Sequence, residues 1–135
     1  MKTPCNTCPF RRDVQPGALG GSPVTTFVGQ VHGPFWLPCH SFTNYSDPNW
    51  KTDYSKPQCV GAAIYRANAV RHQLPEALLK MEPDHKLVFS TPEQFLSHHL
   101  RIPPSFAASA LHAAGGVEHF IQQELQREGA RHVTL

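Results

Sequence analysis

The sequence predicts a small α+β domain. An irregular, loop-rich first half with a few short strands is clipped by a four-cysteine metal site to a helix, and a helical second half follows. Three observations lead to this prediction. Thirteen prolines and nine glycines occur in 135 residues, mostly before residue 59, and they indicate extensive loop structure. A run of β-branched residues at 24–28 predicts a strand. An apolar stripe after Cys59 and a capping signal at Thr91 predict helices.

The first half is expected to hold two short strands. Residues 24–28, Val-Thr-Thr-Phe-Val, are rich in β-branched side chains and have glycines on both sides. Residues 35–37 form a second strand candidate that ends at Pro38. Residues 41–57 are polar and aromatic, with a turn expected at 47–49. Because a loop-rich region with few apolar runs buries little surface, a covalent or metal staple is expected there.

A helix is expected to begin near Cys59 and to end or bend at Pro75. Its apolar residues recur at intervals of three or four, as on one helical face: Val60, Ala63, Ile64, Ala67, Val70 and Leu74. Residues 76–81 are predicted to form another short helix. Residues 86–90 are predicted to form a short strand or an extended link.

Helices are predicted throughout the remainder. Thr91 is a strong N-cap with Pro92 in the first helical position and Gln94 three residues on, and this helix is expected to run to about Leu100. An alanine-rich helix should cover residues 105–114, closed by two glycines, and another should cover 117–128. The chain therefore divides into a cysteine region, residues 1–78, and a helical region, residues 79–135, which are expected to share one core. The simplest core candidates in the helical region are Phe95, Leu96, Leu111, Phe120, Ile121 and Leu125.

Composition and charge narrow the classes of function and the cellular locations that are expected for this chain. The net charge of +2, with nine histidines counted as neutral, is too small to argue for nucleic-acid binding. No apolar stretch approaches the roughly 18 residues that a bilayer-spanning helix needs. The N-terminus lacks the apolar core of a signal peptide. The expected location is therefore the cytoplasm, where thiols stay reduced and cysteine clusters hold metal more often than disulfides.

The four cysteines are Cys5, Cys8, Cys39 and Cys59, separated by 2, 30 and 19 residues. Four thiolates are a full ligand set for a tetrahedral zinc ion or a cubane iron–sulfur cluster. Cys59 stands where a helix begins, so its sulfur lies near the positive end of the helix dipole. Arg11 and Arg12 follow the first pair and offset the negative charge of a thiolate cluster. The sequence therefore predicts one metal site with these four cysteines as ligands.

Three other interpretations of the cysteines compete with the metal site. They could be unrelated buried thiols, but a two-residue gap flanked by prolines is not typical of core cysteines. They could form two disulfides, which the expected cytoplasmic location disfavours. A thioredoxin-like dithiol needs a preceding strand, and none is predicted before Cys5.

The choice of metal stays open between a [4Fe–4S] cluster and Zn²⁺. Zinc knuckles usually contain two C-x-x-C pairs, and this chain has one. One close pair with a following proline and two distant cysteines favours the cluster, whereas zinc is the commoner structural ion of small proteins. The string Cys-x-x-Cys-Pro-Phe-Arg is also similar to the central piece of WhiB-type iron–sulfur regulators, although the order of the other two cysteines differs.

A wider resemblance covers about residues 3–70. The pattern P-C-x-x-C-P-F-R at 4–11, then Cys39-His40, then Cys59-Val60-Gly61 resembles an uncharacterised domain family of phages and bacteria. That family carries P-C-x-x-C-P-W/F-R, C-H and C-x-G at similar spacing. Phe10 stands where tryptophan is commoner. The resemblance implies a shared cysteine site and an association with phages, and it implies no activity.

Residues beside the cysteines are candidates for supporting roles. His40 is expected to donate to a ligand sulfur, with direct ligation as the alternative. Trp36 and Trp50 flank Cys39 in sequence and are expected to shield the site or to fill the core. The histidines of the helical region, His98, His99, His112 and His119, are expected at the surface.

The favoured function is a metal-binding protein, associated with phages, that acts as a protein-binding, regulatory or host-modulating factor. No catalytic set is recognisable, and no catalytic residue is predicted. One alternative is a nucleic-acid-linked, redox-sensing regulator, supported best by Arg11, Arg12, Arg66 and Arg71. The second alternative is an iron–sulfur or zinc enzyme, which requires an open coordination position that four cysteines would fill.

Overall fold

The computed structural model describes residue 4 and residues 7–19, 22–35, 37, 59–71, 73–74 and 81–127. The described part contains five helices: α1 (Val24–His32), α2 (Val60–Ala69), α3 (Pro92–Leu100), α4 (Pro104–Ala113) and α5 (Val117–Gln126). It contains no strand, and an isolated antiparallel bridge joins Arg11 and Val88. The prediction of an α+β fold is therefore wrong, and the described part of the chain is helical.

The predicted strand at residues 24–28 is the first turns of α1. Val24, Phe27, Val28 and Val31 recur at the spacing of one helical face, and the last three are buried while Val24 packs against the core. Burial of this face outweighs the modest preference of β-branched residues for strands. The second strand candidate lies at 35–37, of which Trp36 falls outside the described residues, and neither Phe35 nor Leu37 lies in a strand.

Sequence signals located the later helices well. Cys59 is the N-cap of α2, as expected, although α2 ends at Ala69 rather than near Pro75. The Thr91 hydroxyl accepts a hydrogen bond from the Gln94 N–H at 3.2 Å, which confirms the predicted cap of α3. The predicted helix at 76–81 lies mainly outside the described residues. Residues 86–90 contribute only the bridge at Val88.

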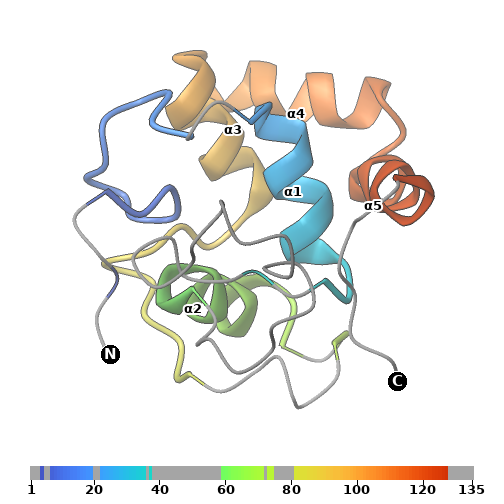
Figure 1. Ribbon diagram of the computed structural model, residues 1–135. Coiled ribbons are helices and arrows are strands. Elements are labelled where there is room, and N and C mark those ends of the chain that lie inside the picture. The colour runs from blue at the N-terminus through green and yellow to red at the C-terminus, as the bar shows by residue number, and fades with distance from the viewer. Residues whose placement is uncertain are drawn as a thin grey trace.

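Helix α1 lies at the centre of the arrangement, since it contacts α2, α3 and α5, while α3 contacts α4 (Figure 1). Helices α2 and α4 lie at opposite ends of the view. None of the helices among the described residues is long and apolar enough to cross a bilayer.

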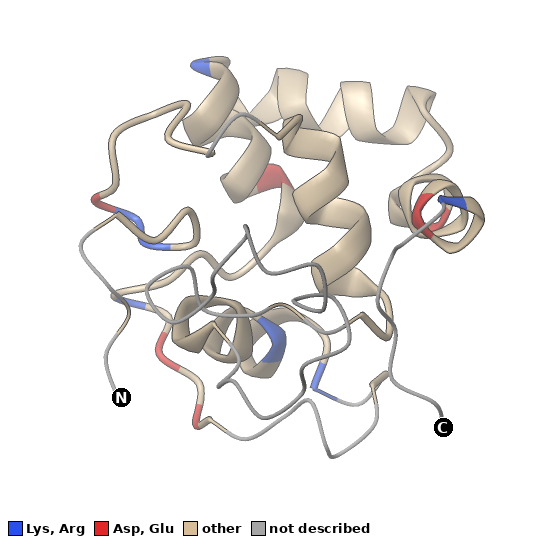
Figure 2. Ribbon diagram, in the orientation of Figure 1, with Lys and Arg blue, Asp and Glu red and all other residues tan. Residues whose placement is uncertain are grey.

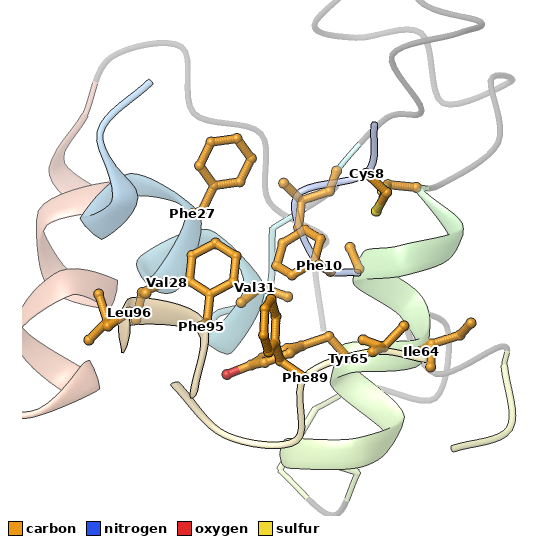
Figure 3. Close-up of a cluster of buried hydrophobic side chains, with 14 of the residues drawn as sticks. Cys8, Phe10, Phe27, Val28, Val31, Ile64, Tyr65, Phe89, Phe95 and Leu96 are labelled. Carbon is orange, nitrogen blue, oxygen red and sulfur yellow. The ribbon is translucent and has the colours of Figure 1, made fainter. Parts of the chain in front are cut away.

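One aromatic cluster joins the cysteine region to the helical region (Figure 3). The Phe10 ring stacks on Phe95 of α3, with ring centroids 5.2 Å apart, and also contacts Tyr65 of α2 and Phe27 of α1. These four rings are all buried. Phe10 follows Cys8 by two residues, so the core fixes the chain close to the first cysteine pair.

Two of the expected core residues occupy other environments. Leu125 of α5 is 44% exposed and Ile121 is partly exposed, whereas Phe95, Leu96, Leu111 and Phe120 are buried as predicted. Helix α5 covers α1 through a narrower face, centred on Phe120 and Glu124.

Candidate metal centre

The structure brings Cys8 and Cys59 together across 51 residues of sequence. Their Sγ atoms lie 3.9 Å apart, and both residues are buried. This separation is about twice the 2.05 Å length of a disulfide bond, so the two sulfurs are not bonded to each other. Figure 3 shows Cys8 beside the start of α2, above the Phe10 ring.

Gly61 makes room for the Cys8 sulfur. A Cβ atom built on Gly61 would lie 2.0 Å from Cys8 Sγ, closer than any side chain allows, while its next neighbours would be 3.4 and 3.6 Å away. The glycine of the Cys-x-Gly pattern therefore lets a sulfur lie directly against the first turn of α2.

The loop that carries Cys8 is held by hydrogen bonds as well as by Phe10. The Arg11 N–H donates to the Cys8 carbonyl at 3.2 Å, which closes a turn after the cysteine. His99 of α3 lies 2.7 Å from the Pro9 carbonyl through Nε2, and its Nδ1 accepts from the Gly17 N–H at 3.0 Å. Because Nδ1 accepts, Nε2 carries the proton and donates to Pro9. A buried, neutral histidine thus ties this loop to α3.

Cys59 has a thiol that ionises easily. Contact with Cys8 is the largest cause that lowers the pKa of the Cys59 thiol from 9.0 to about 7, while burial acts in the opposite direction. The N–H groups of Ala62 and Gly61 and the charge of Arg66 lower this pKa further, although Cys59 makes no side-chain capping hydrogen bond. A thiol with a lowered pKa is a better metal ligand, because the thiolate is the form that binds.

The start of α2 is also joined to the segment that follows α1. The Cys59 N–H donates to the Leu37 carbonyl at 2.7 Å. Farther along α2, the Arg66 guanidinium donates to the Val31 carbonyl in the last turn of α1, at 3.0 Å, and to the Phe35 carbonyl just after α1, at 2.6 Å. Phe35 and Leu37 are therefore both held by α2, and Leu37 precedes Cys39 by two residues.

The remaining predicted site residues, Cys5, Cys39, His40 and Trp36, lie outside the described residues, as does Trp50. Arg11 is described, and its guanidinium bonds both carboxylate oxygens of Asp13, at 2.8 and 2.9 Å, and the Pro4 carbonyl at 3.2 Å. In the described part of the chain, no group of three or more potential metal ligands occurs. Two of the four predicted ligands are thus brought together, and the other two are not placed.

Sequence reasoning missed the burial of four polar side chains among the described residues: His32, Arg66, His99 and Glu124. Arg66, one of the four arginines that support the nucleic-acid alternative, is fully buried. His99, expected at the surface, is also buried, and burial is the largest cause that lowers its pKa. Two sequence features indicated the burial of Arg66. It lies two helical turns after Cys59, and it stands within an apolar stretch. No sequence signal identified His99, because its partners lie more than 80 residues away.

Comparison with known proteins finds no matching family model, no matching curated protein and no matching solved structure. The resemblance to the cysteine-motif family of phages and bacteria therefore stays a proposal.

Proposed function

We propose that this chain is a metal-binding protein in which Cys8 and Cys59, with Cys5 and Cys39, hold one metal ion. The observation that carries the proposal is the 3.9 Å separation of the Cys8 and Cys59 sulfurs in a buried site. Two thiols from distant parts of the chain, with a glycine that leaves space for one of them, fit a thiolate ligand set.

The sulfur separation favours a single ion over a cubane cluster. In a tetrahedral site with bonds of about 2.3 Å, two thiolate sulfurs lie about 3.8 Å apart, close to the 3.9 Å observed. In a cubane cluster each cysteine binds a different iron atom, so the thiolates are held farther apart. Sequence alone favoured a [4Fe–4S] cluster, but this geometry makes Zn²⁺ the better proposal.

Chain connectivity supports the two other ligands. Cys39 follows Leu37 by two residues, which limits their Cα separation to about 7 Å, and the Leu37 carbonyl is bonded to Cys59. Cys5 precedes Cys8 by three residues, a reach of at most about 11 Å. The length of the chain therefore allows both cysteines to reach the described pair.

The ion's proposed role is structural. When bound, Zn²⁺ supplies four strong bonds that cross-link a loop-rich region, and a filled thiolate shell leaves no open position for catalysis. The protein's own part is to hold Cys8 through Phe10 and His99 and to set Cys59 at the start of α2.

For the stabilised fold we propose a protein-binding role, in keeping with the resemblance to phage-associated domains. Helix α4 is the supporting surface, since it contains no charged residue (Figure 2). Phe106 on α4 is 66% exposed, and Leu100, the last residue of α3, is 48% exposed. A photo-crosslinking residue at position 106 is expected to capture one discrete protein, and one at exposed position 118 on α5 is the control. Equal labelling at both positions contradicts a specific surface.

The nucleic-acid alternative loses most of its support. Arg66 is buried and cannot contact a phosphate. Arg11 is paired with Asp13, and Arg12 donates to the His85 and Val88 carbonyls. Arg71 is the remaining one of the four arginines that favoured this alternative. Its side chain is exposed.

Metal analysis of protein purified without oxygen tests the proposal. We expect one equivalent of zinc per chain and its loss in Cys8→Ser and Cys59→Ser. Asp13→Asn, an exposed change near Cys8, is the matched control and should retain zinc. A brown protein that contains iron and sulfide would mean that the site holds an iron–sulfur cluster and not zinc. Wild-type protein that holds no metal and takes none up would refute the proposal.

A further inference from the structure

Arg66 is an unusual residue for the interior of so small a protein. Its side chain is fully buried, on the face of α2 that packs against the core. The guanidinium donates to four backbone carbonyls at the end of α1 and just after it: Gln30 at 2.9 Å, Val31 at 3.0 Å, Gly33 at 3.2 Å and Phe35 at 2.6 Å. The carbonyl end of a helix is the negative end of its dipole, so this position stabilises a cation.

These bonds hold the positive charge at a fixed place inside the protein. A charged group in a low-dielectric interior acts on other charges more strongly than one in water. Because the guanidinium is held by backbone groups, it does not have to reorganise when the charge of a neighbouring site changes.

The cysteine site is such a neighbour. Cys59 and Arg66 are seven residues apart, which places them two turns apart on nearly the same face of α2, about 10 Å along its axis. Both also bind the same segment, Arg66 at residues 30–35 and the Cys59 N–H at Leu37. Burial lowers the pKa of Arg66 to about 10, and the charge of Cys59 acts against that effect.

We propose that Arg66 is the internal countercharge of the cysteine metal site, a positioning residue that strengthens metal binding without touching the ion. This inference rests on the proposed function. When Zn²⁺ replaces the protons of four thiols, the site changes from neutral to a net charge of about −2. With the axial spacing of the two residues, about 10 Å, taken as the scale of the charge separation, a fixed positive charge favours that change by on the order of tenfold per unit of charge at an effective dielectric constant near 20.

Two substitutions separate the charge of Arg66 from its hydrogen bonds. Arg66→Gln keeps a donor and removes the charge, whereas Arg66→Lys keeps both a donor and the charge. Zinc affinity is measured by competition with a chelator under conditions where near-UV circular dichroism shows each metal-free variant to be folded. We expect Arg66→Gln to weaken binding about ten- to a hundredfold, and Arg66→Lys to stay within about threefold of wild type. If Arg66→Gln does not fold, Arg66→Met, which fills similar volume without charge, carries the same prediction.

Leu111→Ala controls for stability, because Leu111 is buried in α4, far from α2. It should destabilise the fold while leaving the zinc affinity of the folded protein unchanged. Equal affinities for the Gln, Lys and wild-type proteins overturn the countercharge. Equal weakening by Gln and Lys also overturns it, since a purely structural role for the hydrogen bonds then suffices. Wild-type protein that binds no zinc instead overturns the proposed function, and this inference with it.

Discussion

Gly61→Ala should displace the Cys8 sulfur and destroy the metal site. The added Cβ would lie 2.0 Å from Cys8 Sγ, whereas a comfortable contact is about 3.5–4.0 Å. One of the two groups must therefore move by about 1.5–2 Å. Metal–thiolate distances tolerate only about 0.2 Å, so a sulfur that has moved so far no longer binds an ion that the other ligands hold.

The free energy of unfolding of the metal-free protein should also fall. Forcing an extra methyl group into a packed site costs about 1–3 kcal/mol. Alanine gains at most about 1 kcal/mol over glycine within a helix, and Gly61 is the second residue of α2. The expected net loss is therefore about 1–2 kcal/mol without metal, and larger when metal is present to stabilise the wild type.

A double-mutant cycle with Cys8→Ala isolates the contact, with urea unfolding and zinc content as the assays. Without the sulfur, the Cβ added at position 61 would meet nothing closer than the Phe10 Cβ at 3.4 Å. We therefore expect Gly61→Ala to be neutral, or stabilising by up to about 1 kcal/mol, in the Cys8→Ala background. If Gly61→Ala costs the same in both backgrounds, or if the single variant retains zinc, the proposed packing of sulfur against α2 is refuted.

Three further predictions concern the frame around the site. Burial, and then the charge of Arg66, lower the pKa of His32 from 6.5 to about 4, so the unfolded chain binds a proton before the folded chain does. The stability that neutral His32 contributes is fully present above pH 6.5, and about 3 kcal/mol of it is lost as the pH falls towards 4. His32→Gln should flatten the pH dependence of the free energy of unfolding, measured with urea, and an unchanged pH dependence would contradict the prediction. Phe10→Ala should cost about 3–5 kcal/mol in the same assay and Phe10→Leu clearly less, whereas equal small losses would show that the aromatic cluster is not the core. In Gly29→Ala the new Cβ would lie 2.4 Å from the Phe120 carbonyl oxygen, so the variant should lose about 1–3 kcal/mol as α5 is pushed away from α1; a more stable variant would contradict that packing.

Local signals account for the helices that the sequence predicted correctly. Thr91, Pro92 and Gln94 define the start of α3 through capping chemistry that depends on neighbouring residues alone. The glycines at 115 and 116 both have positive φ angles, which explains why they separate α4 from α5. Where start and stop depend on a few adjacent residues, sequence reasoning succeeds.

The error at residues 24–28 has a different origin. Residue preference favoured a strand, but the spacing of apolar residues through Val31 favoured a helix, and the helical face is what α2, α3 and α5 cover. Strand preference is weak and depends on packing. The periodicity over eight residues was the better guide, since it reflects which side chains share a face.

The site was predictable only in part for a related reason. Cysteine count and spacing led to a shared site, and Cys8 and Cys59 do lie together. The buried supports, Arg66 and His99, depend on partners 31 to 90 residues away, which no local pattern contains. The distance between the two sulfurs, which favours one ion over a cluster, is likewise a property of the folded chain.

X-ray absorption at the metal edge of the purified protein tests most directly whether the Cys8 and Cys59 sulfurs share one ion. The expected result is a zinc edge with a shell of sulfur neighbours at about 2.3 Å, no nearby metal atom, and one sulfur fewer in Cys8→Ala. A shell of nitrogen and oxygen alone, or a sulfur shell that is unchanged in both Cys8→Ala and Cys59→Ala, would contradict it.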